Sequence, residues 1–300
     1  MPDDSRSALR NCLQSGHFAV TAELTPPRAA ELQSLSEAAA LLKTAVTAVN
    51  LTDGAGARVR MSSLAAAIHL RQQGIEPILQ VTCRDRNRIA IQSDLLGAAA
   101  FGINNVLVIS GDGIREGDDA TPVFDFNSRT LLAAIKKPGM SGDADAASSP
   151  TTSGNFFCGT ADMPCEPPTD WVPDALLAKQ RAGADFVQTQ YCFDIDLLRR
   201  YIGRLADHGL TEQLYFLVGL GPLRSADGAR WMRDNLFGTV MPDGIIRRME
   251  AARDPREEGI EICAELMQEA RDIPGVAGVH LMAPGNHTAI VAAVQLAGLI

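Results

Sequence analysis

Three polar side chains in this sequence have the chemistry to move a proton and to bind a nitrogen heterocycle. Glu23, Asp112 and Gln190 each lie at or near the end of an apolar, strand-like run. A carboxylic acid partly removed from water favours its protonated form and acts as a general acid, whereas a better hydrogen-bonded neighbour stays ionised. Both carboxylates also have a structural interpretation, because Glu23 could pair with Arg28 and Asp112 could start a turn through an Asx hydrogen bond.

Strand periodicity predicts that these three side chains face one another. Successive side chains of a strand alternate between its two faces, and the outer face of a barrel strand packs on helices. Glu23 has the opposite parity to the apolar residues of its run, so we expect it to point inward. Asp112 shares parity with Val106 and Val108 and is expected to continue an interior row to the rim. With Gln190 on the polar face of its own run, the three side chains are expected to converge on one pocket.

The whole chain alternates strand-like and helix-like segments. Eight short runs rich in Val, Ile, Leu and Thr are expected to be strands: Ala19–Thr25, Ala48–Asp53, Pro77–Cys83, Asn105–Asp112, Asn155–Asp162, Asp185–Phe193, Leu214–Leu220 and Gly278–Ala283. Helical stretches between them include Arg58–Gln73, Ile89–Phe101, Asp174–Ala182, Leu197–Asp207 and Pro255–Arg271. This α/β pattern predicts a single-domain (β/α)8 TIM barrel over residues 1–300, with its site at the carboxyl ends of the strands. A doubly wound open sheet is the alternative, disfavoured because no G-x-G-x-x-G follows the first strand.

One segment departs from this alternation. Lys137–Gly154 is rich in Gly, Ser, Pro, Asp and Ala and has no apolar period, so we expect a mobile loop there. It follows a helix and precedes the fifth strand, which places it at the amino-terminal end of the barrel, away from the site. A lid over the site is the less favoured interpretation.

The bulk composition excludes several functional classes. The 300 residues are 46% hydrophobic and 21% charged with a formal net charge of −9, which allows a large core and lacks the basic face of a nucleic-acid binder. No apolar run reaches the roughly 18 residues of a membrane span, and the polar N-terminus is unlike a secretory signal, so we expect a cytoplasmic protein. The six cysteines include no C-x-x-C pair and are expected to be reduced thiols, with no metal site.

Six short motifs, in order along the chain, resemble those of the methylenetetrahydrofolate reductase family. They are Glu23–Arg28, Val49–Ala55, Thr82-Cys83, Gly111-Asp112, Ala182–Asp194 and Pro274–Ala283, with Lys179 just upstream of the fifth. Each motif is short, but six ordered matches across nearly the whole chain are far more specific than any one of them.

The resemblance implies a flavoprotein oxidoreductase of one-carbon metabolism and methionine biosynthesis. Such an enzyme passes a hydride from NADH or NADPH through FAD to 5,10-methylenetetrahydrofolate, giving 5-methyltetrahydrofolate, or runs in reverse. Glu23 would be the general acid, Asp112 would contact pterin and flavin, and Gln190 would bind the pterin; we add Asn286, after the last strand, as a folate contact. FAD would be held by Thr52, Asp53, Gly54, Ala55, Gln80, Ser110, Gly111, Asp112 and Lys179. A second copy of the chain or another one-carbon enzyme is the expected protein partner.

Departures from the family pattern fall at positions expected near FAD. Gln80 stands where the family often has His, Ser110 where Arg or Thr is common, and Ala161–Cys165 replaces a Tyr-Pro-Glu-x-His segment, so a flavin-independent variant stays open.

Two other functions stay open as well. One is a pterin-binding barrel methyltransferase, with zinc held by thiols among Cys83, Cys158 and Cys192. The other is a non-catalytic subunit of a methyl-transfer complex, which would bind folate without oxidising NAD(P)H.

Overall fold

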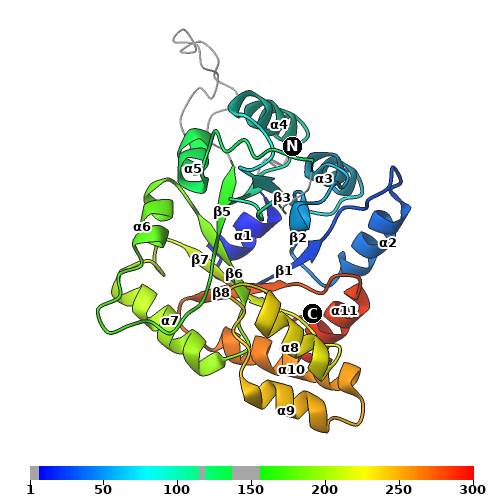
Figure 1. Cartoon of the computed structure of the whole chain (residues 1–300), viewed down its shortest axis with the longest axis vertical. Helices are drawn as coiled ribbons and strands as arrows, with labels where there is room; N and C mark the ends of the chain where they lie inside the picture. The colour runs from blue at the N-terminus through cyan, green and yellow to red at the C-terminus, as the bar shows by residue number, and fades with distance from the viewer. Residues whose placement is uncertain (1–6, 115–118, 137–155) are drawn as a thin grey trace.

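Eight parallel strands close into a barrel in chain order in the computed structural model, which describes residues 7–114, 119–136 and 156–300 (Figure 1). The strands are β1 Ala19–Leu24, β2 Ala48–Leu51, β3 Pro77–Thr82, β4 Asn105–Ile109, β5 Phe157–Asp162, β6 Phe186–Tyr191, β7 Tyr215–Leu220 and β8 Val276–Leu281. β8 pairs back with β1, with His280 beside Thr21, which closes the ring. The predicted single-domain TIM barrel is confirmed; the segment 137–154, interpreted as a loop, lies outside the described residues.

The helices that follow the strands lie outside the barrel, whereas the one that precedes the first strand packs at its amino-terminal end (Figure 1). The helices are α1 Ala8–Gln14, α2 Gln33–Leu42, α3 Ser63–Gln72, α4 Arg88–Ala100, α5 Ser128–Lys136, α6 Asp174–Arg181, α7 Ile195–Asp207, α8 Ala226–Asn235, α9 Asp243–Ala251, α10 Pro255–Arg271 and α11 His287–Leu296, with a 3-10 turn, η1 Ala55–Ala57. Among the described residues, no helix is both long enough and apolar enough to cross a membrane.

Local sequence explains where individual helices begin. Asn87 accepts a hydrogen bond from the Ala90 amide at the start of α4, and Asp254 does the same for α10, where Pro255 takes the first helical position. The helix expected at Arg58–Gln73 begins later, at Ser63. The backbone before it is extended instead, with Arg58 at φ −117°, ψ 145° and Ser62 at φ −52°, ψ 132°, so the helix starts only at Ser63.

The barrel has two apolar layers. The inner layer fills the amino-terminal end of the barrel, where Leu9 and Leu13 of α1 pack against inward-facing side chains that include Leu107 and Phe186. The outer layer lies between the strands and the helices. Val106 and Val108 belong to this outer layer, so the predicted interior row on β4 is wrong: Leu107 faces inward instead. β4 is apolar on both faces, and its alternation therefore carried no signal of which face points inward.

Candidate functional site

Glu23 lies near the carboxyl end of β1 and points into the barrel, as its strand parity predicted. Its carboxylate accepts a hydrogen bond from Gln80 Nε2 of β3 at 3.3 Å. His280 Nε2 of β8 lies 3.9 Å from the same oxygen, Oε2. The Glu23 side chain is 22% exposed and the His280 side chain 4%. Glu23 is thus a half-buried acid that faces a neutral amide and an imidazole, whereas no ion pair with Arg28 is present.

A chain of buried polar side chains lies below Glu23 in the barrel interior. His280 Nδ1 is 3.0 Å from Thr21 Oγ1, which also lies 3.2 Å from Gln188 Nε2. Gln188 and Asn50 pair through both of their side-chain amides, at 2.5 and 3.1 Å. All four of these side chains are almost fully buried. Polar groups in this position are stabilised because each finds a partner inside the barrel.

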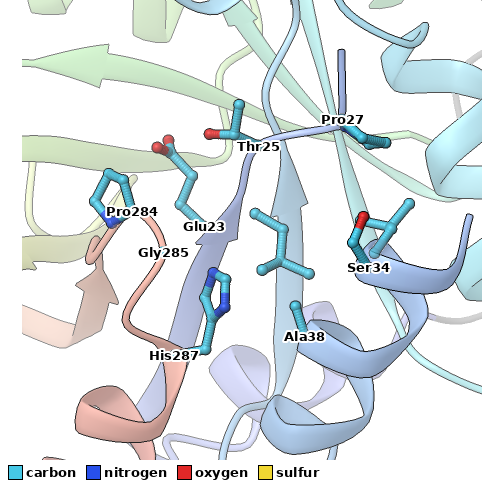
Figure 2. A pocket seen from close by; sticks show the side chains of 10 residues that line it. Glu23, Thr25, Pro27, Ser34, Ala38, Pro284, Gly285 and His287 are labelled. Atoms are coloured by element: carbon cyan, nitrogen blue, oxygen red, sulfur yellow. The ribbon is translucent and has the colours of Figure 1, made fainter. Parts of the chain in front are cut away.

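A pocket of about 210 Å³ opens beside Glu23, between β1, α2 and the loop before α11. Figure 2 shows Glu23 on β1 and Thr25 just beyond the end of that strand, Ser34 and Ala38 on α2, and His287 across from them. Burial, and then the charge of Arg224, lower the pKa of His287, which keeps this imidazole neutral near pH 7. The pocket is therefore a mainly apolar space with one acid at its inner side.

Asp112 lies beyond the end of β4, in an exposed loop, where it holds a neighbouring turn. Its Oδ2 accepts a hydrogen bond from the Gly56 amide at 2.7 Å. The guanidinium of Arg84 donates to the Asp112 carbonyl at 2.9 Å and to the Gly54 carbonyl at 3.1 Å. The Arg84 side chain, only 3% exposed, also pairs with Asp85. Arg84 thus connects the loops that follow β2, β3 and β4.

The glycines at 54 and 111 make room for this arginine. A Cβ at position 54 would lie 2.6 Å from Arg84 Nη2, and one at position 111 would lie 3.1 Å from Arg84 Cβ. Both glycines also have positive φ, at +57° and +96°, which side chains rarely adopt. Close packing around Arg84 is therefore enough to explain why positions 54 and 111 are glycine, whether or not they also contact a cofactor.

Asp53 is less exposed to solvent than Asp112. It accepts a hydrogen bond from the Thr82 amide at 2.9 Å and pairs with Arg86, which bridges to Asp94 at 2.6 Å. Burial raises the pKa of Asp53, and the Arg86 charge and the Thr82 amide oppose that rise. Both of these partners bind Asp53 Oδ2, and they tie the loops after β2 and β3 together.

On the other side of the mouth, Gln190 lies near the carboxyl end of β6, within the strand expected from the sequence. Its Nε2 donates to the Phe237 carbonyl at 3.2 Å, and its Oε1 accepts from the Tyr191 amide at 3.0 Å. The Phe237 side chain is 84% exposed beside it. Gln190 and Asp112 do not line the pocket beside Glu23, and no hydrogen bond joins the three among the described residues, so their convergence on one ligand stays a prediction.

Lys179, on α6, reaches the end of β5. Its Nζ donates to the Ala161 carbonyl at 2.6 Å. Burial lowers the pKa of this amine, and the charge of Asp162 opposes that shift. Asp162 in turn accepts a hydrogen bond from the Tyr201 hydroxyl. Lys179 therefore keeps a neighbouring counter-charge in Asp162, and its remaining N–H groups can donate to a phosphate.

The remaining residues predicted for the site differ in their exposure and in their side-chain hydrogen bonds. Thr52 is buried and its Oγ1 has no partner among the described residues, which marks a donor available at the end of β2. Ser110 is exposed, and Ala55 opens the turn η1. Asn286 precedes α11 next to His287, without a side-chain cap bond to that helix. Its amide is therefore available beside the pocket.

The donor set fits a flavin nucleotide in chemical type. It combines the orphaned Thr52 hydroxyl, the Gln80 amide, a turn with left-handed glycines and the lysine on α6. Hydroxyl, amide and backbone N–H groups suit an isoalloxazine edge, and a lysine suits a phosphate. These residues therefore fit FAD, with the loop geometry around them set by Arg84.

The three cysteines considered as zinc ligands lie outside the barrel mouth. Cys83, Cys158 and Cys192 all belong to the outer apolar layer. Burial raises the pKa of Cys83 to about 11 and those of Cys158 and Cys192 to about 12. Such thiols stay protonated near pH 7, whereas zinc binds thiolates. In the part of the chain that the structure describes, no three His, Cys, Asp or Glu side chains gather as metal ligands.

Sequence reasoning missed Arg84 and His280. Both are charged or titratable types that are usually exposed. The alternation within β8 could have placed His280 inward, because it stands between the apolar residues Val279 and Leu281. For Arg84, no local signal was available.

The fold and the mouth together define a class: a (β/α)8 barrel with a carboxylate-and-amide site at the carboxyl ends of its strands. The family model described as methylenetetrahydrofolate reductase matches residues 8–298. The chain therefore belongs to the methylenetetrahydrofolate reductase family, as its six motifs predicted.

Curated relatives agree with this assignment at low identity. A "probable methylenetetrahydrofolate reductase (NADPH)" of Caenorhabditis elegans is 23% identical over 233 residues, which cover 75% of this chain and 32% of the relative. "Methylenetetrahydrofolate reductase 2" of Saccharomyces cerevisiae is 25% identical over 222 residues, covering 69% of this chain and 34% of the relative. The matched region thus spans about a third of the length of these relatives.

Solved structures share the fold. An uncharacterized protein from Clostridium thermocellum, described as binding two copies of 5-methyl-5,6,7,8-tetrahydrofolic acid, has a TM-score of 0.62 and 12% identity, covering 96% of this chain and 97% of that one. EDTA monooxygenase from Chelativorans sp. BNC1 has a TM-score of 0.53 and 8% identity, covering 93% and 92%. At these identities the likeness shows the fold alone.

Proposed function

We propose that this chain is a flavin-dependent methylenetetrahydrofolate reductase. The reaction joins a hydride from NADH or NADPH and one proton to 5,10-methylenetetrahydrofolate, giving 5-methyltetrahydrofolate, and it can run in reverse. The observation that carries the proposal is Glu23, a half-buried acid that faces Gln80 and His280 and borders a mainly apolar pocket. Family membership and the folate ligand in the name of the Clostridium thermocellum protein support it.

Each residue has a specific task in this proposal. Glu23 gives a proton to the folate nitrogen that leaves when the methylene bridge opens, because only this step of the reaction needs an acid. Gln80 holds the carboxyl group in place through its 3.3 Å hydrogen bond. Gln190, near the end of β6, and Asp112, in the loop after β4, bind the pterin, and Asn286 contacts the folate beside the pocket. The apolar wall of the pocket limits the access of water to the acid.

FAD, when bound, supplies the hydride carrier between the two substrates. Thr52, Gln80 and the turn at Gly54–Ala57 would hold it from one side of the mouth, with Ser110 and Gly111 beside them. Lys179 would hold a phosphate from the other side, with Asp162 as its counter-charge. Asp53 would keep the loops in place through Arg86.

Glu23→Gln tests the proposal because it preserves size and hydrogen bonding but removes the acid. The folate-dependent rate should fall by about 10²–10⁴-fold, the usual contribution of general acid catalysis. Oxidation of NAD(P)H with an artificial electron acceptor should stay within about twofold, since that half of the reaction needs no acid. Glu31→Gln, at an exposed carboxylate on the next loop, is the matched control and should change neither rate.

Three results would contradict the assignment. Equal loss of both rates in Glu23→Gln would make Glu23 a structural residue. Binding of methyltetrahydrofolate without any NAD(P)H oxidation by the wild type would favour the non-catalytic subunit, and transfer of its methyl group to a corrinoid or a thiol would favour the methyltransferase.

A further inference from the structure

The pocket beside Glu23 has a wall made by Pro284, Gly285 and His287, in the segment that leads into α11 (Figure 2). Apolar side chains of α2 line another side of the same space. A cavity of about 150 Å³ is large enough for benzene. The volume of about 210 Å³ here therefore has room for one substituted aromatic ring.

Arg224, in the loop between β7 and α8, lies against this wall. Its Nη2 donates to the Pro284 carbonyl at 2.6 Å, and a Cβ on Gly285 would lie 3.8 Å from the same nitrogen. Burial, and then the charge of Arg224, lower the pKa of His287, which also places the guanidinium close to that ring. Because His287 is neutral near pH 7, the positive charge at this wall is that of Arg224.

The Arg224 guanidinium still has donors available for a ligand. Among the described residues no carboxylate pairs with it, and its hydrogen bond to the Pro284 carbonyl uses only one of its N–H groups. Arg84, at the same mouth, is paired with Asp85 instead. A planar guanidinium without a partner in the protein suits a carboxylate, which it can bind through two parallel hydrogen bonds.

The parts of the proposed substrate follow one another in the same order as these groups. In 5,10-methylenetetrahydrofolate, the methylene carbon bridges a pterin nitrogen and the nitrogen that carries the aminobenzoyl ring. Reduction to the 5-methyl compound frees this second nitrogen, and Glu23 must reach it to protonate it. The ring bonded to that nitrogen would then enter the apolar pocket next to Glu23. The glutamate, with its carboxylates, would follow on the far side of the ring.

We propose that the pocket holds the aminobenzoyl ring of the folate and that Arg224 binds a carboxylate of its glutamate tail. The inference rests on the proposed function for the identity of the ligand, and it adds the residue that recognises the charged end. Arg224 is exposed, so the rest of the tail extends into solvent. No bond forms or breaks at Arg224, which is a binding residue and not a catalytic one.

Calorimetry with two ligands tests the tail contact. One is 5-methyltetrahydrofolate, and the other is the methylamide of 5-methyltetrahydropteroic acid, which keeps the pterin, the ring and a neutral amide but has no glutamate. We expect the wild type to bind the folate about five- to thirtyfold more tightly, as for an ion pair that includes charge-assisted hydrogen bonds. This ratio should fall as salt is added, because the contact is exposed. Arg224→Gln should bring the ratio close to one by weakening only the folate, and Arg224→Lys should keep part of it.

Arg181→Gln is the matched control, at an exposed arginine in the last turn of α6 on another side of the barrel (Figure 1), and should leave the ratio unchanged. A wild-type ratio below about twofold would overturn the inference, would leave the proposed function standing and does not require any variant to fold.

Two results with Arg224→Gln would overturn the inference as well. Equal weakening of both ligands would mean that Arg224 only holds the wall through Pro284. Loss of affinity for NAD(P)H in place of the folate would assign the guanidinium to a phosphate of the nicotinamide substrate. Failure of the wild type to bind either folate ligand would instead refute the proposed function together with this inference.

Discussion

Replacing Arg84 should destabilise the barrel mouth more than any exposed substitution. Its guanidinium is 3% exposed and donates to two backbone carbonyls, those of Gly54 and Asp112, at 3.1 and 2.9 Å. Methionine keeps much of the volume of the side chain but removes all of these donors. Hydrogen bonds to charged groups contribute about 1.5–3 kcal/mol each, so two of them set an upper bound of about 6 kcal/mol.

Two effects reduce that figure. Asp85 is 40% exposed, so its pairing with Arg84 adds little and its charge can return to water. The Gly54 and Asp112 carbonyls lie in partly exposed loops and can also regain water. We therefore expect Arg84→Met to cost about 2–4 kcal/mol of unfolding free energy.

Urea denaturation is the appropriate assay, because a lower midpoint at unchanged slope reports lost stability. Arg88→Met is the matched control: this exposed arginine lies over the Phe126 ring at 4.6 Å, a contact that contributes about 0.5–1 kcal/mol. A loss below about 1 kcal/mol for Arg84→Met, or one equal to that of Arg88→Met, would refute the view that Arg84 holds the three loops together.

Four further outcomes are expected. Gly111→Ala should lower stability by about 1–3 kcal/mol in urea denaturation, because its φ is +96° and its Cβ would meet Arg84 and Thr82 at 3.1–3.2 Å; a neutral result would show that the loop relaxes freely. Thr52→Val should reduce the FAD recovered per chain after denaturation, and unchanged recovery would remove Thr52 from the cofactor site. Asp112→Asn should weaken methyltetrahydrofolate binding in calorimetry by about tenfold or more; an unchanged affinity would limit Asp112 to its turn. In brief iodoacetamide labelling of the native protein, read by mass spectrometry, exposed Cys165 should react well before Cys83, Cys158, Cys192 and Cys263, whose thiols are buried and have raised pKa values; equal labelling would contradict their burial.

The strand order and the inward position of Glu23 could be read from the sequence because both depend on local periodicity. β1 alternates polar and apolar side chains, so its two faces differ and parity identifies the inner one. The same reasoning failed on β4, where Leu107 rather than Val106 and Val108 faces inward. A strand buried on both sides has no polarity difference between its faces, and then only its neighbours determine the orientation.

The site shows the same division between local and tertiary information. Motif order was enough to assign the family, and it placed Glu23, Asp112 and Gln190 at strand ends, since a motif is a local property. The tertiary structure alone decided that Arg84 is buried beneath two glycines and that His280 faces Glu23. His280 and Thr21 are 259 residues apart, and they meet because β8 pairs with β1 to close the barrel. The partners of a polar side chain, which determine its protonation and its role, are set by that closure rather than by its neighbours in the chain.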